Sequence, residues 1–379
     1  MRILLVTHNL VRGDGQGRIN YELAHHALRS GHSLTVVADR ADSDLVAAGA
    51  RIIPIHPRFR KPNLLKVMKF AREANRIVRQ AREGCDIVIG NGYVFTEPHD
   101  LNLCQFVHGA WINSPVHVSR VSRGPYAWYQ YLYTSCNSKW EKLAYAAARF
   151  VVAPSQQIRD ELIGIGVAEE KVRVIYNGVD LEEFHPGLED RAALQLPPTG
   201  PLALFVGDIR TPRKNLDSVL RAMVSSPALH LAVVGAVDRS PFPQLAGQLG
   251  IADRVHFLGF RRDVSQLMRA CDMFTFPSRY EAGSLVLLEA MGSALPIVTA
   301  RSAGGSELIS NDAGVVLDSP EDVAGLARAM NHFAGDLQAR IRAGQAARRI
   351  ALDHSWARMA QEYLMLAQER FDAVARSQP

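Results

Sequence analysis

Short apolar runs alternate with amphipathic stretches along the whole chain. In the first half, apolar runs predict buried strands at residues 3–7, 34–38, 51–55, 86–90, 104–108 and 150–154. Helical patterns between them cover about 18–30, 64–82 and 126–148, and Gly31 suits the C-cap of the first helix. Continuous apolar strands separated by helices are typical of a parallel sheet covered on both faces.

The same alternation restarts in the second half, after a strand at 172–177 and a weakly patterned stretch at 187–200. Strands are predicted at 202–207, 231–235, 254–259, 273–277, 296–300 and 314–317, with helices at about 215–223, 264–270, 284–292 and 356–371. We therefore predict an α/β protein of two Rossmann-like, doubly wound domains, residues 1–176 and 177–355, and a final helical segment at 356–379. Ligands of such sheets bind beyond the carboxyl ends of the strands, so we expect both domains to face a central cleft.

Composition agrees with two globular domains. The chain has 379 residues, of which 47% are apolar, so each half can bury a core of its own. The amino-terminal apolar run covers only residues 3–6, and no stretch reaches the roughly 20 apolar residues of a spanning helix. We therefore expect a cytoplasmic location, either free or peripheral at the inner face of the membrane. The four cysteines lack C-x-x-C spacing, which favours reduced thiols over a zinc site or disulfides.

Positive charge is concentrated in residues 51–82, the basic segment, although the formal net charge is only +5. The segment has one acid, Glu73, and ten cations: Arg51, Arg58, Arg60, Lys61, Lys66, Lys69, Arg72, Arg76, Arg79 and Arg82. They could be the solvated face of a helix that covers the sheet. Alternatively they bind anionic lipid headgroups together with the aromatic residues of 126–133. A third reading, binding to nucleic-acid phosphates, would leave the motifs of the second half without a role.

A glycine-rich loop, Gly13-Asp-Gly15-Gln-Gly17, lies between the first predicted strand and the first helix. Glycine lets the backbone approach a ligand closely, and a helix amino terminus offers unpaired N–H groups to an anion. The spacing is G-x-G-x-G and not the G-x-G-x-x-G of dinucleotide enzymes, although Asp39 lies where their ribose-binding acid is found. The loop therefore predicts contact with an anion or substrate, with a plain tight turn as the alternative.

A second loop follows the strand predicted at 202–207 and carries three cations, Arg210, Arg213 and Lys214, before a helix begins. Charge-assisted donors beside a helix amino terminus suit a diphosphate. A solvated basic turn is the alternative.

A third loop follows the strand predicted at 273–277 and contains Glu281. Gly283, Ser284 and Leu285 lie at the next helix start, where backbone N–H groups can bind an anion. Glu289 lies further along this otherwise apolar helix, where burying a carboxylate without a partner is costly. We expect both acids to bind polar groups of a ligand, and surface exposure of Glu289 is the alternative.

These loops resemble glycosyltransferase family 4, the group 1 family. Glu281 and Glu289 make the E-x7-E spacing of retaining glycosyltransferases with the GT-B fold, and residues 276–291 read FPSRYEAGSLVLLEAM. Further similar motifs, in the order of the family, are VHG at 107–109, YNGVD at 176–180, FHP at 184–186, FVG at 205–207, RKN at 213–215 and AGGSE at 303–307. The resemblance covers nearly the whole chain.

In the second half the resemblance implies a donor site. Lys214, with Arg213 or Arg210, should hold the donor diphosphate. Glu281 should contact sugar hydroxyls, and Glu289 the ribose hydroxyls. The amides of residues 283–285 should bind the sugar or the diphosphate.

In the first half the resemblance implies that His108 lies beside the transferred sugar. A buried histidine with only a structural role is the alternative. Gly15 and Gly17 should line the cleft, and the segment 356–379 should cross back to the first domain.

Two positions depart from the family pattern. Asp208 stands where the family often has arginine, so either Arg210 or Arg213 supplies the second cation. The family's E-x-F-G-L is Glu281-Ala-Gly-Ser-Leu285 here, which removes an aromatic ring and adds the Ser284 hydroxyl as a further donor to phosphate.

The implied activity is retaining transfer of a hexose from a UDP- or GDP-sugar to a saccharide or lipid-linked saccharide, in cell-envelope polysaccharide synthesis. The nucleotide sugar is a substrate, so no cofactor is expected. No metal is expected either, because the cationic loop takes its place, and we interpret Asp42-Ser-Asp44 as a loop or helix cap. A nucleotide-sugar epimerase of the same fold, which needs no acceptor, is the alternative enzyme.

Overall fold

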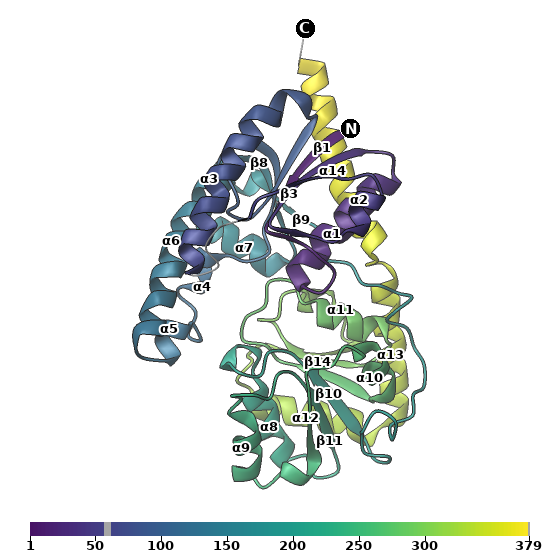
Figure 1. Ribbon diagram of the computed structural model, residues 1–379. Helices are drawn as coiled ribbons and strands as arrows, with labels where there is room; N and C mark the ends of the chain where they lie inside the picture. The colour runs from purple at the N-terminus through teal and green to yellow at the C-terminus, as the bar shows by residue number, and fades with distance from the viewer. Residues whose placement is uncertain (57–61, 378–379) are drawn as a thin grey trace. The chain divides into compact units, whose positions relative to one another are not determined.

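The computed structural model describes residues 1–56 and 62–377, and the chain divides into two compact units (Figure 1). Unit 1 comprises Met1–Asn177 and Trp356–Pro379, and unit 2 comprises Gly178–Ser355. Each unit contains a parallel sheet with helices, as the alternation of apolar and amphipathic segments predicts.

Unit 1 contains a seven-stranded sheet in the order β5-β3-β1-β6-β7-β8-β9, with every pair parallel. Its strands are β1 (Arg2–Val6), β3 (Ser33–Ala38), β5 (Arg51–Pro54), β6 (Ile87–Asn91), β7 (His99–Leu103), β8 (Ala148–Ala153) and β9 (Val172–Val174). Short strands β2 (Asn9–Leu10) and β4 (Arg40–Ala41) form a separate pair. The order of connection reverses between β1 and β6, which makes their carboxyl ends the switch point where such sheets bind ligands.

The helices of unit 1 are α1 (Gly15–Arg29), α2 (Asp44–Ala47), α3 (Asn63–Ala81), α4 (His108–Trp111), α5 (Val118–Val121), α6 (Pro125–Ala147), α7 (Gln156–Gly164) and α14 (Trp356–Ser377), with 3-10 turns at Arg82–Gly84 and Glu169–Lys171. Although α14 is last in the sequence, it packs against α1 and β7 (Figure 1). The Arg18 guanidinium lies 5.7 Å from the Trp356 ring, and Arg370 bonds Asp100 of β7 at 3.2 Å. The end of the chain therefore belongs to the fold of unit 1.

Unit 2 contains a six-stranded sheet in the order β12-β11-β10-β13-β14-β15, also parallel throughout. Its strands are β10 (Leu202–Val206), β11 (His230–Val234), β12 (Val255–Gly259), β13 (Met273–Phe276), β14 (Ile297–Ala300) and β15 (Gly314–Leu317). Its helices are α8 (Leu216–Val224), α9 (Phe242–Gln248), α10 (Val264–Ala270), α11 (Leu285–Gly292), α12 (Val323–Gly335) and α13 (Leu337–Leu352), with 3-10 turns at Pro212–Lys214, Ala252–Arg254 and Ser306–Leu308. In chain order the strands run 3-2-1-4-5-6, the Rossmann arrangement, with the switch point between β10 and β13.

One predicted strand is wrong. We predicted a strand at 104–108, whereas β7 is His99–Leu103, and its five residues are all buried although several are polar. The buried polar groups are paired: the Asp100 carboxylate accepts the Val88 N–H at 2.9 Å, and the Asn102 side chain accepts the Gly92 N–H at 2.9 Å. A strand with this composition does not look apolar in the sequence. Because β7 ends at Leu103, His108 does not end a strand, and the structure places it at the start of helix α4.

Candidate functional site

Strand order explains why the second and third loops meet. β10 and β13 are hydrogen-bonded neighbours, although about 70 residues separate them in the chain, so the loops at their carboxyl ends lie side by side. The Lys214 ammonium forms an ion pair with the Glu281 carboxylate, and the Arg213 guanidinium lies 3.7 Å from the other carboxylate oxygen. The structure thus brings together three of the predicted donor-site residues.

The Lys214–Glu281 pair is largely shielded from water. Lys214 exposes 13% of its side chain and Glu281 exposes 19%, and the ammonium lies 5.2 Å from the Phe276 ring. Burial, and next the charge of Arg213, lower the pKa of Lys214 well below its ordinary value. The charge of Asp208 opposes this lowering, and the ion pair with the Glu281 carboxylate acts in the same direction by stabilising the ammonium. A second anion that reached Lys214 would do the same.

The cationic loop is fixed to the exit of β13 by several hydrogen bonds. Asn215 takes a left-handed conformation (φ 64°), and its side-chain amide donates to the carbonyls of Pro277 and Pro320 at 2.9 and 2.6 Å. Arg279 donates to the Pro212 carbonyl at 2.7 Å and pairs with Asp217 at 2.8 Å. The backbone that carries Arg213 and Lys214 is therefore held without help from a ligand.

The third loop is held by a close backbone approach. The Gly304 N–H donates to the Glu281 carbonyl, and the Ser284 N–H donates to the Gly304 carbonyl, both at 2.9 Å. A methyl group on Gly304 would lie 2.1 Å from the Ala282 carbonyl oxygen, so only glycine fits there. The Ser284 amide is thus already used within the protein. Its hydroxyl is buried and has no hydrogen-bond partner among the residues that the structure describes.

The remaining predicted donor-site residues follow this loop. Gly283 precedes the helix start, and α11 begins at Leu285, so the first N–H groups of the helix have no acceptor within it. Glu289 is half-buried one turn after Leu285. Glu289 is therefore not a fully exposed surface residue, and it lies on α11, the helix that follows the loop of Glu281.

Arg210 and Arg213 differ in their surroundings. The Arg210 guanidinium is 56% exposed and bonds the Asp208 carboxylate at 2.9 Å. Arg213 exposes 29% of its side chain and contacts Glu281. The Asp208 carboxylate, which replaces the family arginine, thus pairs with Arg210, and Arg213 is the arginine beside Lys214.

The glycine-rich loop of unit 1 leads into α1, whose first residue is Gly15. A methyl group on Gly17 would lie 2.8 Å from the Val11 carbonyl oxygen, so glycine is needed for packing there. The side chain of Gln16 donates to Asn91 at 2.5 Å, and Asn91 donates to the buried Asn20 at 2.8 Å. The switch point of unit 1 is therefore occupied by neutral amides.

His108 is the first residue of α4, with its ring centroid 5.0 Å from that of Phe106 and 5.9 Å from that of Tyr133. Burial lowers the pKa of His108 to about 4, so the imidazole is neutral near pH 7. Its Nδ1 atom is buried and finds no hydrogen-bond partner in the described part of the chain.

Sequence reasoning missed Glu141, whose carboxylate accepts the backbone N–H of His108. The sequence offers little sign of this contact, because Glu141 lies between Lys139 and Lys142 in a helix of mixed composition, unlike Glu289 on its apolar helix.

Three acids of unit 1 that the sequence singled out have partners in the protein. Asp39 pairs with Lys66 at 2.6 Å, which argues against a role in ribose binding. Asp42 and Asp44 lie 3.6 and 2.9 Å from Arg12, and Ser43 between them directly precedes α2.

The basic segment is only partly a free charged surface. Ion pairs use Lys66, Arg79 and Arg82, whose partners are Asp39, Glu97 and Asp100. Arg72 and Arg76 are exposed on α3, and Arg58, Arg60 and Lys61 lie outside the described residues. None of the helices in the described ranges has the length and apolar character needed to cross a bilayer.

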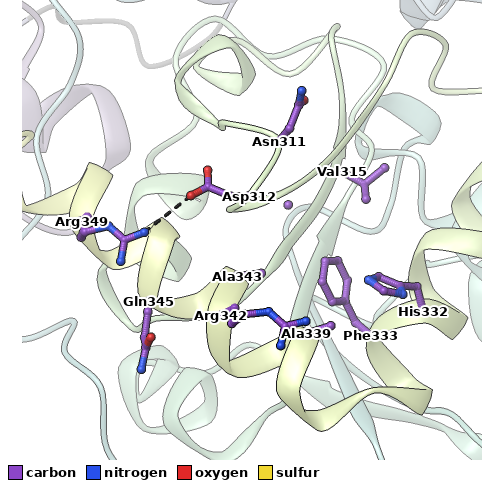
Figure 2. A pocket seen from close by; sticks show the side chains of 11 residues that line it. Asn311, Asp312, Val315, His332, Phe333, Ala339, Arg342, Ala343, Gln345 and Arg349 are labelled. Carbon is purple, nitrogen blue, oxygen red and sulfur yellow. Dashed lines mark ion pairs between the residues drawn. The ribbon is translucent and has the colours of Figure 1, made fainter.

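A separate hollow of about 440 Å³ lies in unit 2 (Figure 2). Gly314, at the amino end of β15, contributes to its wall, and Asp312 and Arg349 pair there at 3.5 Å. The strands of this sheet are parallel, so their amino and carboxyl ends lie at opposite edges. The hollow is therefore distinct from the Lys214–Glu281 cluster.

Two family models match the chain and together cover most of it. Residues 188–350 match the model of group 1 glycosyl transferases, and residues 13–183 match the model of glycosyltransferase family 4. Among curated proteins, D-inositol 3-phosphate glycosyltransferase of Mycobacterium marinum is 35% identical over 188 residues, which are 47% of this chain and 40% of that protein. The enzyme of the same name from Mycobacterium bovis is 33% identical over 197 residues, 49% of this chain and 41% of the relative. The match thus spans less than half the length of these relatives.

Solved structures share the fold over nearly the whole chain. Sucrose-phosphate synthase from Thermosynechococcus elongatus has a TM-score of 0.77 at 19% identity and covers 98% of this chain and 100% of its own. WaaG, a glycosyltransferase involved in lipopolysaccharide biosynthesis, has a TM-score of 0.74 at 21% identity, covering 95% and 98%. Anabaena HepE in complex with UDP-glucose has a TM-score of 0.69 at 20% identity, covering 98% and 100%. The likeness to these structures shows the GT-B fold, and the two family models show that the chain belongs to the group 1 glycosyltransferases of family 4.

Proposed function

We propose that this glycosyltransferase moves a hexose from a UDP- or GDP-sugar to a hydroxyl of a saccharide or lipid-linked saccharide, with retention and without a metal ion, in cell-envelope polysaccharide synthesis. The observation that carries the proposal is the shielded Lys214–Arg213–Glu281 cluster at the switch point of unit 2. Two cations and a helix start meet there, as a pyrophosphate requires. HepE, which has the same fold, was solved with UDP-glucose bound, and this supports the choice of donor class.

In this proposal the donor changes the partner of Lys214. Before binding, Glu281 neutralises the ammonium. The donor diphosphate then takes its place beside Lys214 and Arg213, and the carboxylate becomes available to accept hydrogen bonds from hydroxyls of the sugar. Glu289 accepts bonds from the ribose, while the first amides of α11 and the Ser284 hydroxyl donate to the diphosphate or sugar. Because these groups are shielded from water, each charge interaction is stronger than it would be in solution.

The proposed reaction exchanges one bond at the anomeric carbon for another. The bond to the diphosphate oxygen breaks, the bond from the acceptor oxygen forms on the same face, and the acceptor proton passes to the departing phosphate oxygen. Lys214 and Arg213 stabilise the charge that grows on the leaving group. Unlike the carboxyl pair of a retaining glycosidase, Glu281 and Glu289 act by binding hydroxyls. On unit 1, the neutral imidazole of His108 and the backbone at Gly15 and Gly17 contact the transferred sugar and the acceptor.

We further propose that unit 1 contacts an anionic lipid surface through the basic segment and the start of α6. Tyr126, Trp128 and Tyr131 expose 65%, 69% and 52% of their surface, and Leu65 and Met68 on α3 are also exposed. The Leu64 N–H donates to the Tyr129 hydroxyl at 3.3 Å, which places the starts of α3 and α6 beside each other. Amphipathic aromatics next to arginines suit a headgroup region. Co-sedimentation with phosphatidylglycerol vesicles, but not with phosphatidylcholine vesicles, is expected at low salt.

The donor is tested by thermal stability. A ligand that binds only the folded state raises the melting temperature, so UDP-, GDP- and ADP-glucose should differ in effect, with the true base giving the largest rise. Product analysis follows, because a transferase releases nucleoside diphosphate in the presence of an acceptor, whereas an epimerase alters the donor without one. If no nucleotide sugar stabilises the protein or is consumed with a panel of glycan acceptors, the proposal is wrong.

A further inference from the structure

Glu141 lies on α6 and is almost completely buried, with 1% of its surface exposed. Its carboxylate points at the start of α4, where one oxygen accepts the His108 N–H at 2.9 Å and the other accepts the Gly109 N–H at 2.7 Å. The first N–H groups of a helix need acceptors from elsewhere, and Val107, which precedes α4, has no side chain that can supply one. Glu141 therefore supplies, from another helix, the acceptors that the first turn of α4 lacks.

The packing around this contact leaves little freedom. A methyl group on Gly109 would lie 2.9 Å from Cγ2 of Ile165 and 3.3 Å from Oε1 of Glu141. The backbone at Gly109 is thus enclosed between α6 and the turn after α7, and any side chain there would push α4 away from the carboxylate.

We propose that Glu141 is the positioning residue for His108: by accepting two consecutive backbone N–H groups, it fixes the first turn of α4 and hence the direction of the imidazole. The inference rests on the proposed place of His108 beside the transferred sugar. A displacement of about 1 Å at such a group can cost on the order of 10²-fold in rate, so a buried carboxylate that prevents it has a direct effect on turnover.

The same contact links activity to pH. Burial raises the pKa of Glu141 to about 7, while the N–H groups of Gly109 and His108 oppose the rise. A proton on Glu141 removes the charge that strengthens both hydrogen bonds, so α4 is held less firmly below this pH. His108 itself titrates near pH 4, so an acid limb near pH 7 cannot be assigned to its imidazole.

The titratable groups around Glu141 come from α4, α6, α7 and the residue after β7. They are His108, Lys142, Tyr145, Glu161 and Cys104. Lys142 lowers and Glu161 raises the pKa of Glu141, and burial raises the pKa of Cys104 to about 12. The Cys104 thiol therefore stays neutral across the range in which Glu141 titrates.

The test compares Glu141→Gln with Glu170→Gln, which makes the same chemical change at an exposed position of unit 1. The kcat and KM for donor consumption are measured between pH 5.5 and 8.5, and hydrogen exchange is followed in peptides covering residues 107–112. At pH 8, Glu141→Gln should lower kcat at least tenfold, change KM less than threefold and speed exchange at His108 and Gly109 at least tenfold. It should also abolish the acid limb near pH 7, whereas Glu170→Gln should behave as wild type.

Two further measurements test the role of Glu141: the activity of Gly109→Ala, and hydrogen exchange in the wild-type protein. Gly109→Ala should lower kcat and flatten the acid limb, because α4 is then displaced from the carboxylate whether or not Glu141 carries a proton. If Glu141→Gln fails to fold, the wild-type protein alone must show exchange at residues 108–109, corrected for the intrinsic pH dependence, that rises below pH 7.

The outcomes separate this inference from the proposed function. Normal kcat and an unchanged pH profile in Glu141→Gln, with wild-type turnover intact, would overturn the positioning role alone. Absence of donor turnover in the wild type would instead contradict the proposed function, and the exchange data would still report whether Glu141 holds α4.

Discussion

The two units have the same strand order around their switch points but carry opposite chemistry there. In unit 2 the site is charged, with Lys214 paired to Glu281 and Arg213 beside them. In unit 1 the end of β6 carries the neutral amide of Asn91, which donates to the amide oxygen of Asn20 on α1. The imidazole of His108, also in unit 1, is kept neutral by burial.

In both units the fold provides the location at the strand ends, and the loops provide the chemistry. A diphosphate needs cations that are shielded from water, and unit 2 holds two beside a single carboxylate. The neutral amides and imidazole of unit 1 can bind hydroxyl groups, but they cannot neutralise a pyrophosphate. The contrast therefore supports assigning the donor diphosphate to unit 2.

Removing the charge from unit 2 should have the largest effect. Lys214→Ala deletes the ammonium that is proposed to stabilise the departing diphosphate, and loss of one such group costs about 10²–10³ in kcat. The measurement is release of nucleoside diphosphate from the donor identified by thermal stability.

The matched control is Arg328→Ala, which removes a cation from an exposed position on α12 of the same unit. It should keep kcat within about twofold, since exposed charges away from a site contribute little. A well-folded Lys214→Ala protein with near-normal turnover would contradict the assignment of the diphosphate to unit 2.

The buried carboxyl group of Glu141 in unit 1 should make the free energy of unfolding depend on pH. The pKa of Glu141 rises from about 4.5 to about 7 on folding, so between these values the folded state keeps a proton that the unfolded state releases. The free energy of unfolding then falls as pH rises through this window, by up to about 3 kcal/mol from this group. The unfolding free energy of the wild type, relative to that of Glu141→Gln, should therefore be lower at pH 8 than at pH 4.5 by up to that amount.

Tryptophan fluorescence measures this in the correct unit, because all four tryptophans, Trp111, Trp128, Trp140 and Trp356, belong to unit 1. Glu170→Gln should follow the wild-type curve at every pH. Parallel curves for wild type and Glu141→Gln would mean that the Glu141 carboxyl titrates at its ordinary pKa despite its burial.

The site of unit 2 could be predicted from the sequence because its residues lie in loops directly after apolar strands. The runs ending at residues 207 and 277 are apolar and unambiguous, and the parallel order that makes β10 and β13 neighbours follows from the Rossmann pattern. Lys214 and Glu281 were therefore expected to meet. Their ion pair was not predicted, because it depends on side-chain directions that spacing does not determine.

Unit 1 was harder to predict because its polar groups are buried within strands and helices. Asp100 and Asn102 made β7 look like a loop, and this error placed His108 at the end of a strand. Glu141 was missed because its partners are backbone N–H groups 32 and 33 residues away, which carry no sequence signal. Buried polar residues that bond to backbone are visible only once the fold is known.

The smallest expected effects are those of replacing Arg213 or Arg210, and they show which arginine binds the diphosphate together with Lys214. Arg213→Ala should weaken donor binding about tenfold, since this mostly buried guanidinium lies beside the carboxylate that the diphosphate is proposed to displace. Arg210→Ala should weaken it no more than about twofold, because Arg210 is exposed and already neutralised by Asp208. Titration calorimetry with the nucleoside diphosphate would measure both. A larger loss for Arg210→Ala than for Arg213→Ala would mean that the Arg210–Asp208 pair opens when the donor binds. The hydrogen bonds of Asn215 and Arg279 hold the backbone of the cationic loop in the absence of a ligand. We therefore expect Arg213 and Lys214 to be in position before the donor binds.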